Sequence, residues 1–207
     1  MSLVFYFVPQ STASITEGVL DVLGIPCDRV QLDISNGDTR TPEFLALNPN
    51  GRVPVIVHDD TPIWESAAIT MYLGEVFGVD AGLYPALGPK RGEAMKWITW
   101  SNVTLAEAAG RLAATLPQGS DGGVVEGSRD WVPVEQRSAA AREKAEADLV
   151  ACLGILDRAL AGKAFLLGNY CLADTHVQGF VGWIEGMGVD LAPFVNVRQW
   201  AARTPER

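Results

Sequence analysis

Residues 48–73 decide the fold, and they read NPNGRVPVIVHDDTPIWESAAITMYL. Within this stretch, Val53-Pro54 precedes the short apolar run 55–57, and apolar residues recur at helical spacing after Glu65-Ser66. Because proline has no N–H to donate, a sheet tolerates it at the first residue of a strand. The stretch therefore predicts a strand hairpin followed by a helix that begins near residue 66.

Two features of this stretch indicate a binding site for a small, charged, peptide-like molecule. If the Val53-Pro54 peptide bond is cis, the N–H and C=O of Val53 face outward and can pair with an extended peptide as an added strand. A helix that begins at Ser66 offers N–H groups and a hydroxyl to a carboxylate, and Glu65 attracts an ammonium. Each feature also has a structural interpretation: a trans proline at a strand edge, and a helix cap beside a first-turn acid.

The whole chain separates into two parts. Residues 1–78 alternate short β-branched runs with helical patterns, which is typical of a strand–helix–strand unit that leads into the hairpin. Residues 79–89 are rich in glycine and proline and are predicted to be a linker. Residues 90–207 carry helical patterns only, interrupted by the irregular segment 117–133. We expect an α/β domain, a linker and an all-helical domain.

Composition narrows the function classes. The chain has 207 residues, of which 48% are hydrophobic, and a formal net charge of −9 at pH 7. Its basic residues are scattered, so we expect no nucleic-acid partner, since phosphate contacts need clustered Lys and Arg. No apolar run approaches the roughly 18 residues of a membrane span and no signal peptide is apparent. We therefore expect a cytoplasmic protein without membrane partners.

The cysteines and histidines show no metal-ligand pattern. Cys27, Cys152 and Cys171 are odd in number and widely separated, without a C-x-x-C pair. His58 and His176 have no Cys or His at ligand spacing. We expect free thiols, structural histidines and no metal site.

The order of several blocks resembles the cytosolic glutathione S-transferase family. Asn48-Pro49 leads to Val53-Pro54, Glu65-Ser66 follows, and the helix continues as Ala-Ile-x-x-Tyr-Leu. Residues 3–32 and 163–200 agree with the family in order and spacing as well. The resemblance implies an α/β thioredoxin-like N-terminal domain, an all-α C-terminal domain and a homodimer. It also implies glutathione as co-substrate, with a small electrophile as the second substrate.

The same resemblance implies which residues hold glutathione. It places the hydroxyl and N–H of Ser66 on the γ-glutamyl carboxylate, Glu65 on the ammonium, and the Val53 backbone on the cysteinyl unit. Arg52 or Asn50 is expected near the glycyl carboxylate. The implied glutathione-binding residues are Ser11, Asn50, Arg52, Val53, Pro54, Glu65 and Ser66.

One block departs from the family pattern. The family usually has Ser or Thr three residues before Asp174, where this chain has Cys171. Cysteine is a poor acceptor, so one half of this helix-capping box is weakened, at a cost of about 1 kcal/mol. Asp174 can still accept from the N–H groups at the helix start, and we interpret it as structural.

The catalytic group is expected in the loop between the first strand and the first helix, residues 8–14, which read VPQSTAS. Thioredoxin-like redox proteins carry a C-x-x-C pair there, and its absence excludes exchange by a cysteine pair. One hydroxyl that donates to the ionised thiol of glutathione suffices, since each unit of pKa lowering needs about 1.4 kcal/mol. By the family spacing we rank Ser11 first, Thr12 second and Ser14 third, with Tyr6 weaker. The alternative is that all three hydroxyls only cap the helix.

We expect a transferase that binds glutathione, stabilises its thiolate and conjugates it to small apolar electrophiles. The electrophile pocket is expected between the first loop and the helical domain, at Pro9, Trp100 and Trp131. Trp97, Trp100 and Trp131 also suit helix core packing. The alternatives are a glutathione-dependent isomerase or dehalogenase, and a non-catalytic scaffold module of the same fold.

Overall fold

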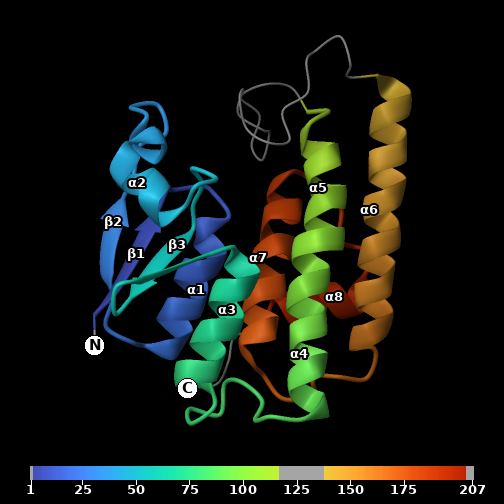
Figure 1. The fold of residues 1–207 in the computed structure, drawn as a ribbon. Helices are drawn as coiled ribbons and strands as arrows, with labels where there is room; N and C mark the ends of the chain where they lie inside the picture. Colours follow the sequence, from blue (N-terminus) through green and yellow to red (C-terminus); the bar gives the residue numbers. More distant parts are fainter. Residues whose placement is uncertain (1, 117–137, 204–207) are drawn as a thin grey trace. The chain divides into compact units, whose positions relative to one another are not determined.

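The computed structural model describes residues 2–116 and 138–203, and this part of the chain divides into two compact units (Figure 1). The first unit comprises the described residues up to Ile98 together with Cys171–Gly179, and the second comprises the other described residues. Strands and helices alternate in the N-terminal part, whereas the C-terminal part is helical. The expected α/β thioredoxin-like N-terminal domain and all-α C-terminal domain are therefore confirmed.

A four-stranded mixed sheet forms the centre of the first unit. Its order is β2-β1-β3-β4, with β1 parallel to β2 and antiparallel to β3, and β4 antiparallel to β3. A two-residue turn, Asp59-Asp60, joins β3 to β4, and both turn residues have positive φ, as a tight hairpin requires. The strand bounds are β1 Leu3–Phe7, β2 Asp28–Gln31, β3 Val55–His58 and β4 Thr61–Trp64.

Helix α1, Ala13–Leu23, and helix α3, Ser66–Leu73, contact each other and lie side by side in Figure 1. Each buries an apolar stripe, α1 through residues such as Ile15 and Val19 and α3 through Ile69 and Leu73. The helix α1 ends at Gly24, whose left-handed φ of 64° lets its N–H reach the Leu20 carbonyl. The neighbouring N-termini of these two helices are the elements that position the candidate site.

The short helix α2, Pro42–Leu47, begins as its sequence predicts. Thr41 accepts a hydrogen bond from the Phe44 N–H, and Pro42 occupies the first turn, where its missing N–H costs nothing. The Phe44 ring is buried and meets the Tyr6 ring edge-on, with centroids 6.1 Å apart. The helix α2 therefore covers the face of the sheet from which Tyr6 projects, and the segment after α2 leads to Val53-Pro54.

A π-helical turn, Gly74–Gly78, continues α3. The Tyr84 ring packs on Gly74, and the Tyr84 Cβ lies next to Gly78. A Cβ atom at Gly74 would lie 2.7 Å from that ring, so a larger residue does not fit there. Burial raises the pKa of Tyr84 to about 12. The buried Arg91, on helix α4, Pro89–Trp100, donates to the Pro85 carbonyl at 2.9 Å and to Glu75 at 3.2 Å.

The N-terminal part of helix α7, Leu172–Gly186, belongs to the first unit although it lies far along the chain. Asp174 is fully buried, and its carboxylate accepts the Cys171 N–H at 3.0 Å, which confirms the structural role predicted for it. The buried His176 imidazole shares a hydrogen bond of 2.8 Å with the Thr70 hydroxyl. His58, at the end of β3, is bonded to the Tyr72 hydroxyl at 2.6 Å, so both histidines have structural partners.

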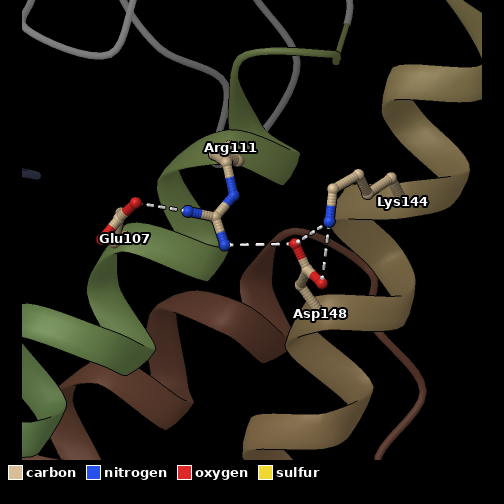
Figure 2. A network of polar contacts seen from close by, with 4 residues as sticks. All are labelled: Glu107, Arg111, Lys144 and Asp148. Carbon is tan, nitrogen blue, oxygen red and sulfur yellow. Dashed lines mark hydrogen bonds and ion pairs between the residues drawn. The ribbon is translucent and has the colours of Figure 1, made fainter.

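In the second unit, α4 ends and a π-helical turn, Ser101–Leu105, leads into α5, Ala106–Ala113. The long helix α6, Ala139–Leu160, buries residues at helical spacing, among them Ala145, Leu149, Leu153, Leu156 and Leu160. On the surface of this α5–α6 pair, Figure 2 shows Arg111 between Glu107 and Asp148, and Lys144 on the same Asp148 carboxylate. Such exposed ion pairs add only about 0–1 kcal/mol each.

Helix α8, Val195–Ala201, is capped by a side chain from α6. The Asp157 carboxylate accepts the N–H groups of Asn196 at 2.8 Å and Val197 at 3.1 Å. Among the described residues, no group of three or more His, Cys, Asp and Glu side chains is placed to hold a metal ion. None of the helices in the described ranges combines the length and apolar character that crossing a bilayer requires.

Candidate functional site

The strand register brings three separate segments to one end of the sheet. Tyr6 of β1 and Trp64 of β4 are both paired with Val55, the first residue of β3. The chain that leaves β1, the chain that enters β3 and the chain that leaves β4 therefore meet at the same end. These are the loop 8–12, the Val53-Pro54 dipeptide and the Glu65-Ser66 dipeptide. The N-termini of α1 and α3 lie at this end because each helix directly follows one of these segments.

The Val53-Pro54 peptide bond is cis, which is one of the two possibilities that the sequence left open. Neither the N–H nor the C=O of Val53 hydrogen-bonds to another described residue, although Val53 is half-buried. A backbone donor and acceptor without partners can pair with an extended peptide in the manner of an added strand.

Asn48 organises the loop that leads to Val53. Only 3% of Asn48 is exposed, and its side-chain amide donates to the Arg52 carbonyl at 2.7 Å. Its Oδ1 accepts the Asn50 N–H at 3.1 Å and the Asn50 side-chain amide at 3.0 Å. The loop is thus held from inside by one amide group. Asn48 was not among the predicted site residues, although an Asn-Pro-Asn-Gly turn favours side chain–backbone hydrogen bonds of this kind.

Arg40 lies next to this loop and adds a cation to Arg52, although it was not among the predicted site residues. Its guanidinium donates to the Asn50 carbonyl at 3.4 Å and reaches over Gly51. Gly51 has a φ of +61°, and a Cβ atom there would lie 2.8 Å from the Thr39 carbonyl oxygen. Only glycine allows this close approach. Arg40 ends a single 3₁₀ turn, Asp38–Arg40, which has no motif that could have marked it.

Glu65 has an unusual backbone conformation at the start of α3. Its φ is 73° and its ψ is 118°, which non-glycine residues rarely adopt. Its side chain is exposed and forms no ion pair with the described residues, while Ser66 next to it is only 4% exposed. The site therefore presents a carboxylate directly beside a buried hydroxyl at a helix N-terminus.

The loop after β1 places several hydroxyls at the N-terminus of α1. The Ser11 hydroxyl donates to the Val8 carbonyl at 2.7 Å and accepts the Ala13 N–H at 3.1 Å. Thr12 is exposed at the N-cap position but does not cap the helix with its side chain. The exposed Ser14 hydroxyl donates to the Ser11 carbonyl at 3.0 Å. Tyr6 projects instead toward α2.

The charged side chains around the site are separated by sign. Arg40 and Arg52, beside the loop before β3, are exposed and form no ion pair within the described ranges. Glu65 supplies a single unpaired carboxylate at the α3 end of the site. The arrangement suits a ligand with a carboxylate at one end and an ammonium group at the other.

Pro9 and Trp100, two of the residues expected to line the electrophile pocket, belong to different units. Pro9 is exposed in the first unit, and Trp100 is half-buried in the second. Trp97 is 8% exposed, and the Lys96 ammonium lies over its ring at 5.0 Å. Trp131 and the segment 117–133 lie outside the described residues.

The fold and the site together define a thioredoxin-like protein with a helical C-terminal domain. The family profile of the glutathione S-transferase N-terminal domain matches residues 2–75. Glutathione S-transferase GstB of Escherichia coli K12 is 29% identical over 191 residues, which cover 91% of this chain and 85% of that protein.

Solved structures agree over nearly the whole chain. A glutathione transferase from Burkholderia graminis, solved with two glutathione molecules bound per subunit, superposes with a TM-score of 0.81 at 25% identity. The superposition covers 97% of this chain and 82% of that one. Ure2p in complex with S-hexylglutathione shares the fold, with a TM-score of 0.82 at 21% identity, over 97% of this chain and 92% of Ure2p. These findings support a place for the chain in the glutathione S-transferase family, with the family match itself lying in residues 2–75.

Proposed function

We propose that this protein is a glutathione transferase that binds glutathione at the described end of the sheet, stabilises its thiolate and conjugates it to small apolar electrophiles. The observation that carries the proposal is the conformation of Glu65, whose exposed carboxylate is held at φ 73° beside Ser66. A backbone conformation of this kind costs about 1–3 kcal/mol and is concentrated at ligand sites. A protein without a ligand for this carboxylate gains nothing from that cost.

The γ-glutamyl end of glutathione is an α-amino acid with both charges. Glu65 is proposed to bind its ammonium, and the hydroxyl and N–H of Ser66 its carboxylate, with support from the positive end of the α3 dipole. The backbone of Val53, beside Pro54, would pair with the cysteinyl unit through the N–H and C=O that lack partners. These contacts place the thiol toward the N-terminus of α1.

The glycyl carboxylate is proposed to lie against Arg52, Asn50 and Arg40. The two guanidinium groups are exposed and without ion pairs in the described ranges, so neither has to break an ion pair to bind a carboxylate. The buried Asn48 amide fixes Asn50 and the Arg52 carbonyl, which preorganises this part of the loop.

The reaction needs an ionised thiol. A hydroxyl of Ser11 or Thr12 is proposed to donate to the sulfur, and the helix dipole of α1 adds a favourable field. With an aryl halide, the thiolate sulfur forms a bond to the ring carbon, and the halide leaves with the bonding electron pair. The thiol proton has by then gone to water, so the hydroxyl remains neutral throughout.

Two observations on relatives support the proposal. The relatives from E. coli and Burkholderia are named as glutathione transferases, and the Burkholderia protein has glutathione bound. Ure2p, named without a transfer reaction, also binds a glutathione derivative. This favours, as a second candidate function, a module that binds glutathione without conjugating it. A glutathione-dependent isomerase or dehalogenase uses the same thiolate on a different electrophile, and an isomerase releases glutathione unchanged because the bond to sulfur breaks again.

Thermal melting with and without glutathione tests binding, because a ligand of the native state raises its stability by about 2.7 kcal/mol at a hundredfold excess over Kd. Glu65→Gln should weaken binding by about 10- to 150-fold, the usual loss of a hydrogen bond to a charged group. Glu143→Gln, at an exposed position of α6, is the matched control and should change nothing. No melting shift at millimolar glutathione refutes the proposal.

Turnover separates the candidate functions. Conjugation of an aryl halide by a protein that binds glutathione supports the transferase. Binding without conjugation, isomerisation or dehalogenation of any tested electrophile would point to the binding module.

We further propose that residues 1–78 form the glutathione-binding domain and that two copies of the chain associate as a homodimer. The first unit exposes Trp64, Val76 and Leu87, the last of them at 84%. Apolar side chains of this size favour burial by a partner, and symmetric dimers are the commonest oligomers. Light scattering that gives the 22.2 kDa of a single chain contradicts the dimer. The proposed function as a glutathione transferase is compatible with the cytoplasmic location expected from the sequence.

A further inference from the structure

We propose that Thr12 is the hydroxyl donor to the glutathione thiolate and that Ser11 is a positioning residue that fixes the loop. This assignment rests on the proposed function and names the donor within it. It reverses the order that the family spacing gave, because the hydrogen bonds of the two hydroxyls differ.

The Ser11 hydroxyl already forms two hydrogen bonds within the loop. A serine hydroxyl has one proton, and that proton is directed at the Val8 carbonyl, 2.7 Å away. The same oxygen accepts the Ala13 N–H at 3.1 Å. To donate to a sulfur atom, Ser11 would have to abandon the Val8 carbonyl, which lies in a half-buried part of the loop. Leaving a partly buried acceptor unsatisfied opposes that rotation.

The Thr12 hydroxyl forms no hydrogen bond with the described residues. Thr12 is exposed, and its side chain does not form even the cap bond that its N-cap position allows. Its N–H likewise has no partner in the described ranges. Thr12 therefore offers two free donors at the start of α1, and neither has to break a bond before it reaches a ligand.

The bonds of Ser11 explain why it is needed without touching the sulfur. Its hydroxyl joins the last residue before the turn, Val8, to the first residue of α1, Ala13. Its carbonyl accepts both the N–H of Ser14 at 3.1 Å and the Ser14 hydroxyl at 3.0 Å. This set of bonds fixes the path of the chain between strand and helix, and with it the position of Thr12.

The experiment compares Thr12→Val, Thr12→Ser and Ser11→Ala in the full chain. For each variant, the pH midpoint of the bound glutathione thiolate is measured from its ultraviolet absorbance, and turnover is measured with an aryl halide. Affinity for glutathione and for S-methylglutathione, which has no ionisable thiol, is measured by calorimetry, and folding by thermal melting. Thr104→Val, at an exposed threonine of the second unit, is the matched control.

Thr12→Val should raise the pH midpoint by about one unit, a tenfold loss of thiolate, and lower turnover by about 10- to 100-fold. Its melting temperature and its affinity for S-methylglutathione should equal those of the wild type, because no intramolecular bond is lost. Thr12→Ser should restore the midpoint. Ser11→Ala should lower the melting temperature and shift the midpoint less than Thr12→Val does.

The assignment is overturned if the pH midpoint rises by about one unit in Ser11→Ala and is unchanged in Thr12→Val. It is also overturned if the pH midpoint is unchanged in both variants. If the wild type binds glutathione and ionises its thiol normally in these cases, the proposed function survives and only the donor is wrong. A wild type that does not bind glutathione overturns both.

Discussion

Replacement of Asn48 by alanine should destabilise the protein and weaken glutathione binding together. The side chain is almost fully buried and forms three hydrogen bonds, one to the Arg52 carbonyl and two from Asn50. At about 0.5–1.5 kcal/mol for each bond, Asn48→Ala should lower the free energy of unfolding by about 1.5–4.5 kcal/mol. Urea unfolding followed by circular dichroism measures this change.

The same substitution releases the backbone that leads to Val53. Fixing one residue costs about 1–2 kcal/mol of conformational entropy, and the ligand must supply that free energy once Asn48 no longer does. Glutathione should therefore bind about 5- to 30-fold more weakly to Asn48→Ala, as measured by titration calorimetry well below the unfolding temperature.

Asn36→Ala is the matched control, because Asn36 is an exposed asparagine whose side-chain amide donates, among the described residues, only to Asp38 at 2.8 Å. It should change stability by less than about 0.5 kcal/mol and leave binding unchanged. The reasoning is refuted if Asn48→Ala unfolds at the same urea concentration as the wild type. It is refuted equally if Asn48→Ala is destabilised but binds glutathione with full affinity.

Three further outcomes follow from the buried titratable groups. Burial lowers the pKa of His176 to about 3, so below about pH 6.5 the unfolded chain takes up a proton that the folded chain refuses. The free energy of unfolding should therefore fall by about 1.4 kcal/mol more from about pH 7.5 to 5.5 in the wild type than in His176→Gln; equal losses in urea titrations contradict this. Asp174→Ala should cost about 1–3 kcal/mol in the same assay, because the buried Cys171 N–H loses its acceptor, and a loss below about 0.5 kcal/mol would count against the cap. Burial raises the pKa of the half-buried Cys27 thiol, but Cys152 and Cys171 are buried more deeply and the pKa of Cys171 is raised to about 12, so a disulfide reagent should react with Cys27 in a separate, faster phase than with the other two thiols. Cys27→Ser should abolish that phase, and a second rapid thiol would show the burial to be wrong.

Local features of the fold could be predicted from the sequence because each depends on neighbours in the chain. Pro54 before an apolar run predicted where β3 begins, and the change of apolar spacing predicted a helix from Ser66. The start of α2 depends on neighbours in the chain too, because the Thr41 side chain caps the helix and Pro42 occupies its first turn, but α2 was not predicted. Propensity, capping and turn formation act over a few residues, so their signals survive in a single sequence.

The candidate site could be predicted only in part. Val53, Glu65 and Ser66 were found because they are close together in the sequence and carry a family pattern. The roles of Asn48 and Arg40 depend on which groups they reach in the folded loop, and neither has a motif. The ranking of Ser11 over Thr12 rested on spacing, which contains no information on where a hydroxyl proton points.

The sequence by itself predicted the strand–helix–strand start, the hairpin, the helix that begins near Ser66 and the helical C-terminal part, and it carried the resemblance to the glutathione S-transferase family. The tertiary structure decided which of these elements meet. The register of Val55 with both Tyr6 and Trp64 brings three segments to one end of the sheet. The hydrogen bond between Thr70 and His176 joins residues 106 positions apart and places the start of α7 in the first unit. Such contacts form because apolar faces are buried and buried polar groups are paired across the whole chain. These free energies depend on residues far apart in the sequence, so no local stretch of residues predicts them.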